Sequence, residues 1–509
     1  MDADQLARSA QVLWDGDALR ALGAFIRIPN VSPMFAPDWA EAGHMAAATA
    51  LLRDWAAARP IPGLSVEVAA LPGRTPLIVI DAPAAGGGPA GETVLLYGHL
   101  DKQPAMSGWR AGLGPWAPVR DGDRLYGRGS ADDGYALFAA LGVLEALRAA
   151  GGAHSRCVVV VEASEESGSP DLPAYIDALS DRIGTPSLVV CLDSGCETYD
   201  RLWVTTSLRG IVGLSVTVEI LEEGVHSGSA GGVVPSSFRI LRQLLSRIED
   251  ESTGHIRLPE LHVEIPPARR AQLEATAVEL GAGAAGAFPL VSGASLIDDG
   301  APFAQVCNRT WRPALATVGL DGIPPTGDAG NVLRPLTRAK LSVRLPPTLD
   351  AELAAAALVR TLSADPPNGA RVTVEVADRG TGWDAPPTEA WLASALDAGS
   401  DAGFGRPARY RGEGGSIPFM AMLGARFPDA QFVVTGVLGP GSNAHGPNEF
   451  LHLPTAVAVT TAVAHVLDAH ARKPARGPAR EPAPEPARTP ARTPARRDDV
   501  ADARAGATR

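Results

Sequence analysis

Three short apolar runs constrain the fold of this 509-residue chain more than any other feature. They are TVLLYGH (93–99), CVVVVEAS (157–164) and SLVVCLD (187–193). Their length and their content of β-branched residues indicate strands that are buried on both faces. Between the first two, residues 132–152 have apolar side chains at helical spacing, acids at the start and glycines at the end. This strand–helix–strand unit predicts an α/β fold with a mostly parallel sheet.

The middle of the chain has a different order of elements, which is strand, helix, strand, strand, helix, strand. The predicted ranges are 210–220, 236–250, 313–320, 338–345, 349–364 and 371–378. This order is the ferredoxin-like split pattern of an α+β domain, here with an additional segment at about 255–312. A strand of the first kind, QFVVTGV (431–437), returns only near the end of the chain.

We therefore expect one domain that is interrupted by another. The α/β domain would cover residues 1–206 and resume at 385–470, with 207–384 inserted as a ferredoxin-like domain. Residues 471–509 contain repeated proline, alanine and arginine and no aromatic residue. Such a composition cannot bury enough apolar surface to fold, so we expect a disordered tail there.

Charge and cysteine content exclude several classes of protein. The net charge of −12 argues against a general nucleic-acid binder, which normally carries a basic excess. Four cysteines without a C-x-x-C pair indicate free thiols in a reducing compartment. The chain shows no signal-peptide pattern and no apolar run of about 18 residues. We expect a cytoplasmic protein with no membrane or nucleic-acid partner.

Histidines and carboxylates follow the predicted strands or precede the predicted helix. They are His99, Asp101, Asp132, Glu165, Glu166, Asp193 and His445. The carboxyl ends of parallel strands meet at one edge of a sheet, where ligands bind in open α/β folds. Each residue alone would more often belong to a turn or a helix cap. Their shared position favours a site.

The chemistry of this set points to metal ions. Imidazole and carboxylate together suit zinc, manganese or cobalt, and no thiolate is needed. Two histidines and three carboxylates are enough ligands for two ions if one carboxylate bridges them. A further carboxylate that stays unbound would be placed to act as a general base.

The stretches that hold these residues resemble the successive signatures of the M20 family of metallopeptidases, most of all its dipeptidase branch. They are GHLDKQP, RLYGRGSADDGYALFAAL, SEESGS, CLDSG and SNAHGPNE, in that order along the chain. Five signatures in the family's order are far more specific than any one of them.

The resemblance implies a role for each residue of the set. The metal ligands would be His99, Asp132, Glu166, Asp193 and His445. Asp132 would bridge two ions, and its bond to Asp133 is typically cis in the family. Glu165 would be the general base that activates the attacking water. Asp101 would orient His99 from behind.

The resemblance also assigns residues outside the first domain. His226 would reach the active site of the partner subunit and stabilise the oxyanion. Arg344 would bind the substrate's carboxylate through its planar guanidinium. Asn331 would contact the substrate, and Ser416 would lie near the substrate's carboxylate in a glycine-rich loop. Without the resemblance, these are equally surface or turn residues. The inserted domain would act as a lid and form a homodimer.

Two positions depart from the family pattern. Many relatives have lysine after the paired aspartates, where this chain has Gly134. Lys102 directly follows Asp101, and a cation there would favour an acidic substrate if it faced the site. We expect the Lys102 side chain to point to solvent instead.

The sequence therefore predicts a dinuclear metal-dependent hydrolase. It would cleave the amide bond of dipeptides or small peptides that have a free C-terminal carboxylate. Zinc is the expected metal, with manganese or cobalt as alternatives. An N-acyl amino-acid amidohydrolase, of the deacylase or desuccinylase type, is the alternative function for the same site. A catalytically silent binding protein of the same fold is less favoured, because every ligand position and the base are present.

Overall fold

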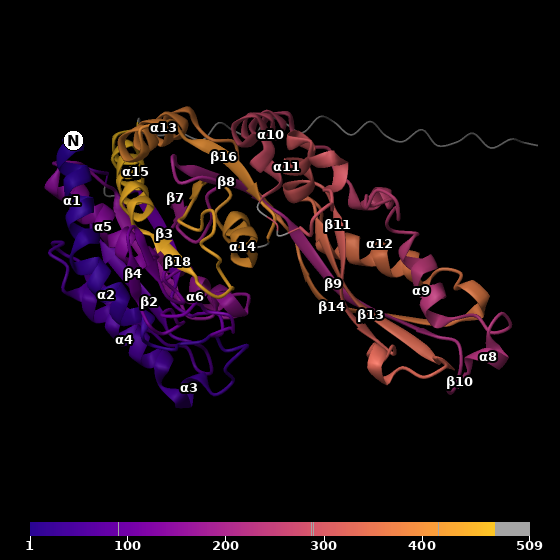
Figure 1. The fold of residues 1–509 in the computed structure, drawn as a ribbon. Helices are drawn as coiled ribbons and strands as arrows, with labels where there is room; N and C mark the ends of the chain where they lie inside the picture. The colour runs from indigo at the N-terminus through magenta and orange to yellow at the C-terminus, as the bar shows by residue number, and fades with distance from the viewer. Residues whose placement is uncertain (90, 287, 289, 416, 474–509) are drawn as a thin grey trace, which may run out of the picture. The chain divides into compact units, whose positions relative to one another are not determined.

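The computed structural model describes residues 1–473 except 90, 287, 289 and 416 (Figure 1). The largest of its sheets has nine strands, in the order β1-β2-β6-β3-β7-β17-β8-β15, with β16 paired to β8. The strands are β1 (Ser65–Ala69), β2 (Leu77–Ala82), β3 (Thr93–His99), β6 (Arg156–Glu162), β7 (Pro186–Cys191), β8 (Trp203–Leu208), β15 (Trp383–Asp384), β16 (Arg409–Glu413) and β17 (Gln431–Val434).

The four strands in the middle of this sheet, β6, β3, β7 and β17, run parallel to one another. Antiparallel neighbours flank them, namely β2 and β1 beside β6, and β8 beside β17. Every residue of β3 and β17 is buried, as expected for strands covered on both faces. The prediction of a mixed α/β fold with a largely parallel central sheet is confirmed.

Helices cover both faces of the sheet (Figure 1). One face packs against α1 (Ala3–Asp15), α2 (Asp17–Ile26), α4 (His44–Ala57), α5 (Ala136–Ala149), α13 (Ala390–Phe404) and α15 (Leu453–Arg472). The other face packs against α6 (Leu172–Ala178) and α14 (Pro418–Arg426). Alternate residues of β3 enter the two cores: Val94 and Leu96 belong to the first, and Leu95 and Tyr97 to the second.

A second, four-stranded antiparallel sheet has the order β11-β13-β9-β14. Its strands are β9 (Gly210–Glu219), β11 (Ala314–Asp321), β13 (Leu336–Leu345) and β14 (Arg371–Gly380). The helices α9 (Ser237–Leu245) and α12 (Ala351–Ser363) pack with it in a core of its own. Along the chain the order is β9, α9, β11, β13, α12, β14. A short ladder of β10 (Val225–His226) and β12 (Val332–Leu333) accompanies it.

The additional segment between α9 and β11 forms a small helical unit. Its helices α10 (Pro267–Leu280) and α11 (Pro302–Thr310) share a cluster of buried residues. The Thr276 hydroxyl donates a hydrogen bond to the Tyr410 carbonyl oxygen of β16, at 2.6 Å. This segment therefore packs against a strand of the nine-stranded sheet.

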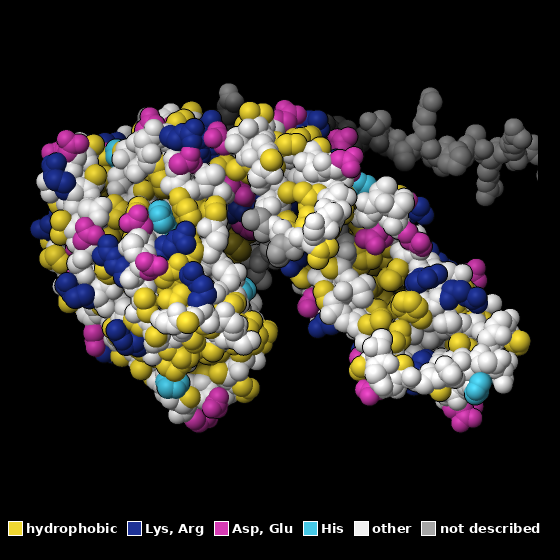
Figure 2. Space-filling model, in the orientation of Figure 1, with side chains coloured by type: hydrophobic (Ala, Val, Ile, Leu, Met, Phe, Trp, Pro, Cys, Tyr) yellow, Lys and Arg dark blue, Asp and Glu magenta, His cyan; other side chains and the backbone are white. Residues whose placement is uncertain are grey.

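On the face of the molecule drawn in Figure 2, acidic and basic side chains are interspersed. Among the described residues, no helix has the length and apolarity required to span a bilayer. The expected tail, 471–509, lies outside the described residues from position 474 onward.

The close packing of α13 on α15 yields a test of the fold. A Cβ atom on Gly399 of α13 would lie 2.7 Å from the Ala462 carbonyl oxygen of α15. On Gly23 of α2, the nearest atom would be 3.8 Å away. We expect Gly399→Ala to lower the free energy of unfolding by about 1–3 kcal/mol. Gly23→Ala should raise it by about 0.5–1 kcal/mol, because alanine favours helix. Urea denaturation of both variants measures this, and equal stability would contradict the packing described.

Candidate metal centre

The predicted site residues meet at the carboxyl ends of the central strands. His99 is the last residue of β3, and Asp193 lies two residues after β7. Glu165 and Glu166 lie in a single 3₁₀ turn (Glu165–Ser167) after β6. Asp132 precedes α5, and its peptide bond to Asp133 is cis, as the resemblance implies. His445 lies in the loop that follows β17.

Two groups of three side chains place their ligand atoms within 4.8 Å of one another. The groups are His99, Asp132 and Asp193, and Asp132, Glu166 and His445. His99 Nε2 lies 3.4 Å from Asp132 Oδ1, and His445 Nε2 lies 3.1 Å from Asp132 Oδ2. The two oxygens of Asp132 therefore face different histidines. This is the arrangement that a bridging carboxylate requires.

The donor atoms fit divalent cations. His99 Nε2 and Glu166 Oε1 are buried and have no hydrogen-bond partner within the described part of the chain. A buried polar atom without a partner is costly unless something else satisfies it. Nitrogen and oxygen donors of this kind suit the divalent metals of hydrolases. The five side chains expected as ligands thus form a set that fits two ions.

Burial and like charge dominate the electrostatics of the cluster. Burial raises the pKa of Glu165 well above its usual range, and the charge of Asp193 raises it further. Burial, followed by the charge of Asp132, raises the pKa of Glu166. Burial opposes ionisation of Asp132 as well, but hydrogen bonds with His445 and His99 outweigh it and lower its pKa. A pair of cations would offset the repulsion among these carboxylates.

Asp101 holds the turn that carries both glutamates. Its carboxylate accepts hydrogen bonds from the backbone N–H groups of Glu165, at 3.1 Å, and Glu166, at 3.0 Å. The nearest acceptor to His99 Nδ1 is the Asp101 carbonyl oxygen, at 3.0 Å, and the carboxylate Oδ1 is 3.4 Å away. The contacts to the turn are visible only in the structure. The orienting role toward His99 stays a prediction.

Glu162 supports the same turn from the end of β6. Its carboxylate accepts hydrogen bonds from the hydroxyls of Tyr97 at 2.6 Å, Ser169 at 2.8 Å and Ser164 at 3.2 Å. Burial is the main cause that raises the pKa of Glu162 to about 7. Glu162 thus fixes the two serines that flank the Glu165–Ser167 turn.

Lys102 does not point to solvent, so that expectation is wrong. The side chain is fully buried, and its Nζ donates to the carbonyl oxygens of Phe25 and Ile28, both at 2.8 Å. These carbonyls lie at the C-terminal end of α2, whose partial negative charge favours a cation. The structure also explains Gly134, because a Cβ atom there would lie 2.2 Å from the Gly129 carbonyl oxygen.

The remaining predicted residues lie elsewhere or outside the described part of the chain. His226 is exposed in β10, and the neighbouring Ser227 N–H donates to the Asn331 carbonyl oxygen at 2.9 Å. Arg344 lies in β13, where burial lowers its pKa. Ser416 lies outside the described residues. The roles of all four in substrate binding stay predictions.

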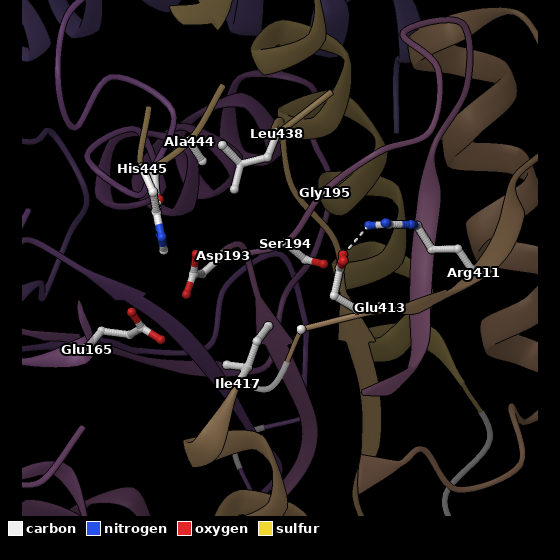
Figure 3. Close-up of a pocket in the computed structure, with 12 residues that line it drawn as sticks. Glu165, Asp193, Ser194, Gly195, Arg411, Glu413, Ile417, Leu438, Ala444 and His445 are labelled. Carbon is white, nitrogen blue, oxygen red and sulfur yellow. Dashed lines mark hydrogen bonds and ion pairs between the residues drawn. The ribbon is translucent and has the colours of Figure 1, made fainter. Parts of the chain in front are cut away.

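A cavity of about 330 Å³ adjoins the metal-ligand cluster (Figure 3). Glu165, Asp193 and His445 lie on one side of it, and Arg411 and Glu413 lie on the other. The rest of the lining is Asp132, Ser194, Gly195, Gly415, Ile417, Leu438 and Ala444. A small molecule in this cavity would contact the cluster at one end and a pair of charged side chains at the other.

Sequence reasoning missed this second end of the cavity. Arg411 donates hydrogen bonds to Glu413 at 2.5 Å and to Glu197 at 3.0 Å. Glu413 is the last residue of β16, which is parallel to β8 and therefore runs opposite to the central strands, so the strand-end rule does not predict it. The strand itself, RYRGE, is too polar to stand out as a buried strand. Gln103, whose amide donates to Glu166 at 2.6 Å, was missed as well.

Two curated proteins are similar to this chain over most of its length. A cysteinylglycine-S-conjugate dipeptidase of Corynebacterium striatum is 29% identical over 391 residues, which cover 74% of this chain and 80% of that protein. A Cys-Gly metallodipeptidase of Saccharomyces cerevisiae is 28% identical over 416 residues, which cover 76% of this chain and 81% of that protein.

Two solved structures share the fold of this chain, and a family model matches most of its length. The dipeptidase Dug1p from Saccharomyces cerevisiae matches with a TM-score of 0.71 and 23% identity, over 93% of this chain and 99% of that chain. Human carnosine dipeptidase 1 matches with a TM-score of 0.71 and 20% identity, over 92% and 99%. At such identities the likeness shows the fold alone. The model of peptidase family M20/M25/M40 matches residues 95–469, and the chain therefore belongs to this family of peptidases.

Proposed function

We propose that this chain is a dinuclear metal-dependent dipeptidase. It cleaves the amide bond of dipeptides or small peptides that have a free C-terminal carboxylate. The observation that carries this proposal is the pair of ligand groups that share Asp132, beside Glu165, which belongs to neither group. The dipeptidase names of the relatives support the size of the substrate.

Zinc is the proposed metal, with manganese or cobalt as alternatives that the same ligands accept. His99 and Asp193 would hold one ion, Glu166 and His445 the other, and Asp132 both. When bound, the two cations polarise the substrate carbonyl and lower the pKa of the attacking water.

Glu165 is the proposed general base. Its carboxylate lines the cavity, and its Oε2 lies 4.0 Å from His99 Nε2. Burial and the charge of Asp193 raise its pKa, which increases its affinity for a proton. Glu165 takes one proton from the attacking water and then delivers it to the leaving amine.

Substrate binding is proposed to involve the second sheet. Residues 207–384 would form the inserted lid and dimerisation domain, so that a homodimer is the working unit. Arg344 would bind the C-terminal carboxylate, with Asn331 and Ser416 nearby. His226 would stabilise the oxyanion in the active site of the partner subunit.

The names of the relatives favour a dipeptidase over an N-acyl amino-acid amidohydrolase. The far end of the cavity adds no preference, because the Glu413 carboxylate there is paired with Arg411 at 2.5 Å.

A substrate panel tests the function directly. The chain is stripped with EDTA, reloaded with zinc, manganese or cobalt, and assayed with Cys-Gly, other dipeptides, and N-acetyl and N-succinyl amino acids. We expect metal-dependent hydrolysis of dipeptides and little of the acylated compounds. Turnover of the acylated compounds alone would contradict the dipeptidase proposal. Inactivity with every metal would favour a catalytically silent binding protein of the same fold.

Replacing Glu165 separates catalysis from metal binding. We expect Glu165→Gln to keep its metal and to lower kcat by about 10²–10⁴-fold, because the amide cannot accept the water's proton. Elemental analysis measures the metal, and steady-state kinetics measure kcat. The control is Glu222→Gln on the surface, which should behave as the wild type. Full activity of Glu165→Gln would refute the assigned mechanism.

Substrates with and without a terminal carboxylate test the role of Arg344. We expect Arg344→Ala to lower kcat/KM by about 10–100-fold for a dipeptide, since a charged hydrogen bond is lost. The same variant should change little for the corresponding dipeptide amide. The control is Arg338→Ala, an exposed residue on the same strand. Equal losses on both substrates would argue against carboxylate binding.

A further inference from the structure

A buried ion pair lies beside the metal-ligand cluster without belonging to it. Arg128 and Glu449 are 1% and 0% exposed, and their charged atoms are 2.8 Å apart. Neither residue has a role in the proposed chemistry. Burying two charges costs free energy, so a pair of this kind needs complete hydrogen bonding to be tolerated.

Arg128 uses all three guanidinium nitrogens. Nε donates to the Pro104 carbonyl oxygen at 3.1 Å, and one terminal nitrogen donates to the Gly446 carbonyl oxygen at 2.8 Å. The other terminal nitrogen donates to Glu449 at 2.8 Å. A single planar group thus joins the loop after β3, the segment before α5 and the loop after β17.

The Glu449 carboxylate accepts hydrogen bonds from three backbone N–H groups in addition to that from Arg128. Its Oε2 also accepts the Gly129 N–H at 3.1 Å. Its Oε1 accepts the N–H groups of Ala131 at 3.1 Å and Asp132 at 3.3 Å. The carboxylate therefore fixes the backbone of the residue that both ligand groups share.

The contacts of the pair converge on one of the two ligand groups. Gly446 directly follows His445 in the chain. Pro104 directly follows Gln103, whose amide donates to Glu166 at 2.6 Å. Asp132 is bound through its own N–H. Asp132 is thus held directly, His445 through the adjacent Gly446, and Glu166 through the side chain of Gln103, the neighbour of Pro104.

The other group is positioned differently. His99 ends the central strand β3, and Asp193 follows β7. Of this group, the ion pair bonds only to the shared Asp132. The group of Asp132, Glu166 and His445 thus depends on loops that the ion pair joins. The group of His99, Asp132 and Asp193 depends mainly on the sheet.

We propose that Arg128 and Glu449 are a positioning pair that sets the geometry of the Asp132–Glu166–His445 metal site. Their loss weakens the ion bound there far more than the ion at His99 and Asp193. This inference rests on the two-metal centre of the proposed function. Outer partners of metal ligands typically contribute about 10–100-fold in affinity.

Cobalt titration of the metal-free protein tests the pair without any assay of activity. Calorimetry and visible absorption follow the two binding steps. In Glu449→Gln and in Arg128→Lys, we expect one equivalent to keep its affinity within about threefold and the other to weaken about 10–100-fold. Arg128→Lys keeps the charge but loses the planar fork, so it tests the same claim should Glu449→Gln fail to fold.

A matched control removes a buried charge elsewhere. Arg201 is 2% exposed in its side chain and pairs with Glu279 at 2.6 Å, outside the cavity lining. Arg201→Met should lower the melting temperature and leave both cobalt affinities unchanged. Equal weakening of both equivalents, or a lower melting temperature with both affinities intact, in the Glu449 or Arg128 variants would overturn the inference. A wild-type protein that binds fewer than two ions would instead contradict the two-metal centre itself.

Discussion

Repulsion among carboxylates that are buried together is the constraint on which this structure depends. Asp132, Glu165, Glu166 and Asp193 meet around two histidines, and burial raises the pKa of three of these four acids. Such a cluster persists only where rigid backbone holds it and cations can offset its charge. Many of the polar contacts around the cluster hold its backbone in place. Asp101 and Glu162, for example, clamp the turn that presents the paired glutamates.

Apart from the adjacent Glu165 and Glu166, the fold brings these acids together from segments that are far apart in sequence. The parallel strands β6, β3, β7 and β17 end at one edge, with apolar cores on both faces. Each strand is buried along most of its length, so its last residues have few alternative positions. The loop after β17 adds His445 from the far end of the chain. The whole sheet therefore stabilises the site. The loops between its strands mainly adjust the positions of the ligand side chains.

The sequence predicts the parts of this arrangement that follow local rules. The apolar runs at 93–99 and 187–193 reveal buried strands, and the acids or histidines at their ends reveal the metal-ligand edge. Contacts between distant segments leave no such trace: Arg128 and Glu449 meet across 321 positions. Lys102 likewise looks like a surface residue until the end of α2 is seen to enclose it.

A crystal structure of the metal-loaded chain, with anomalous data collected at the metal's absorption edge, would show whether the two ligand groups share Asp132. We expect two ions about 3.5–4 Å apart. Asp132 should bind both of them, His99 should bind one and His445 the other, with Glu165 bound to neither. A single ion, or two ions that do not share Asp132, would contradict this expectation.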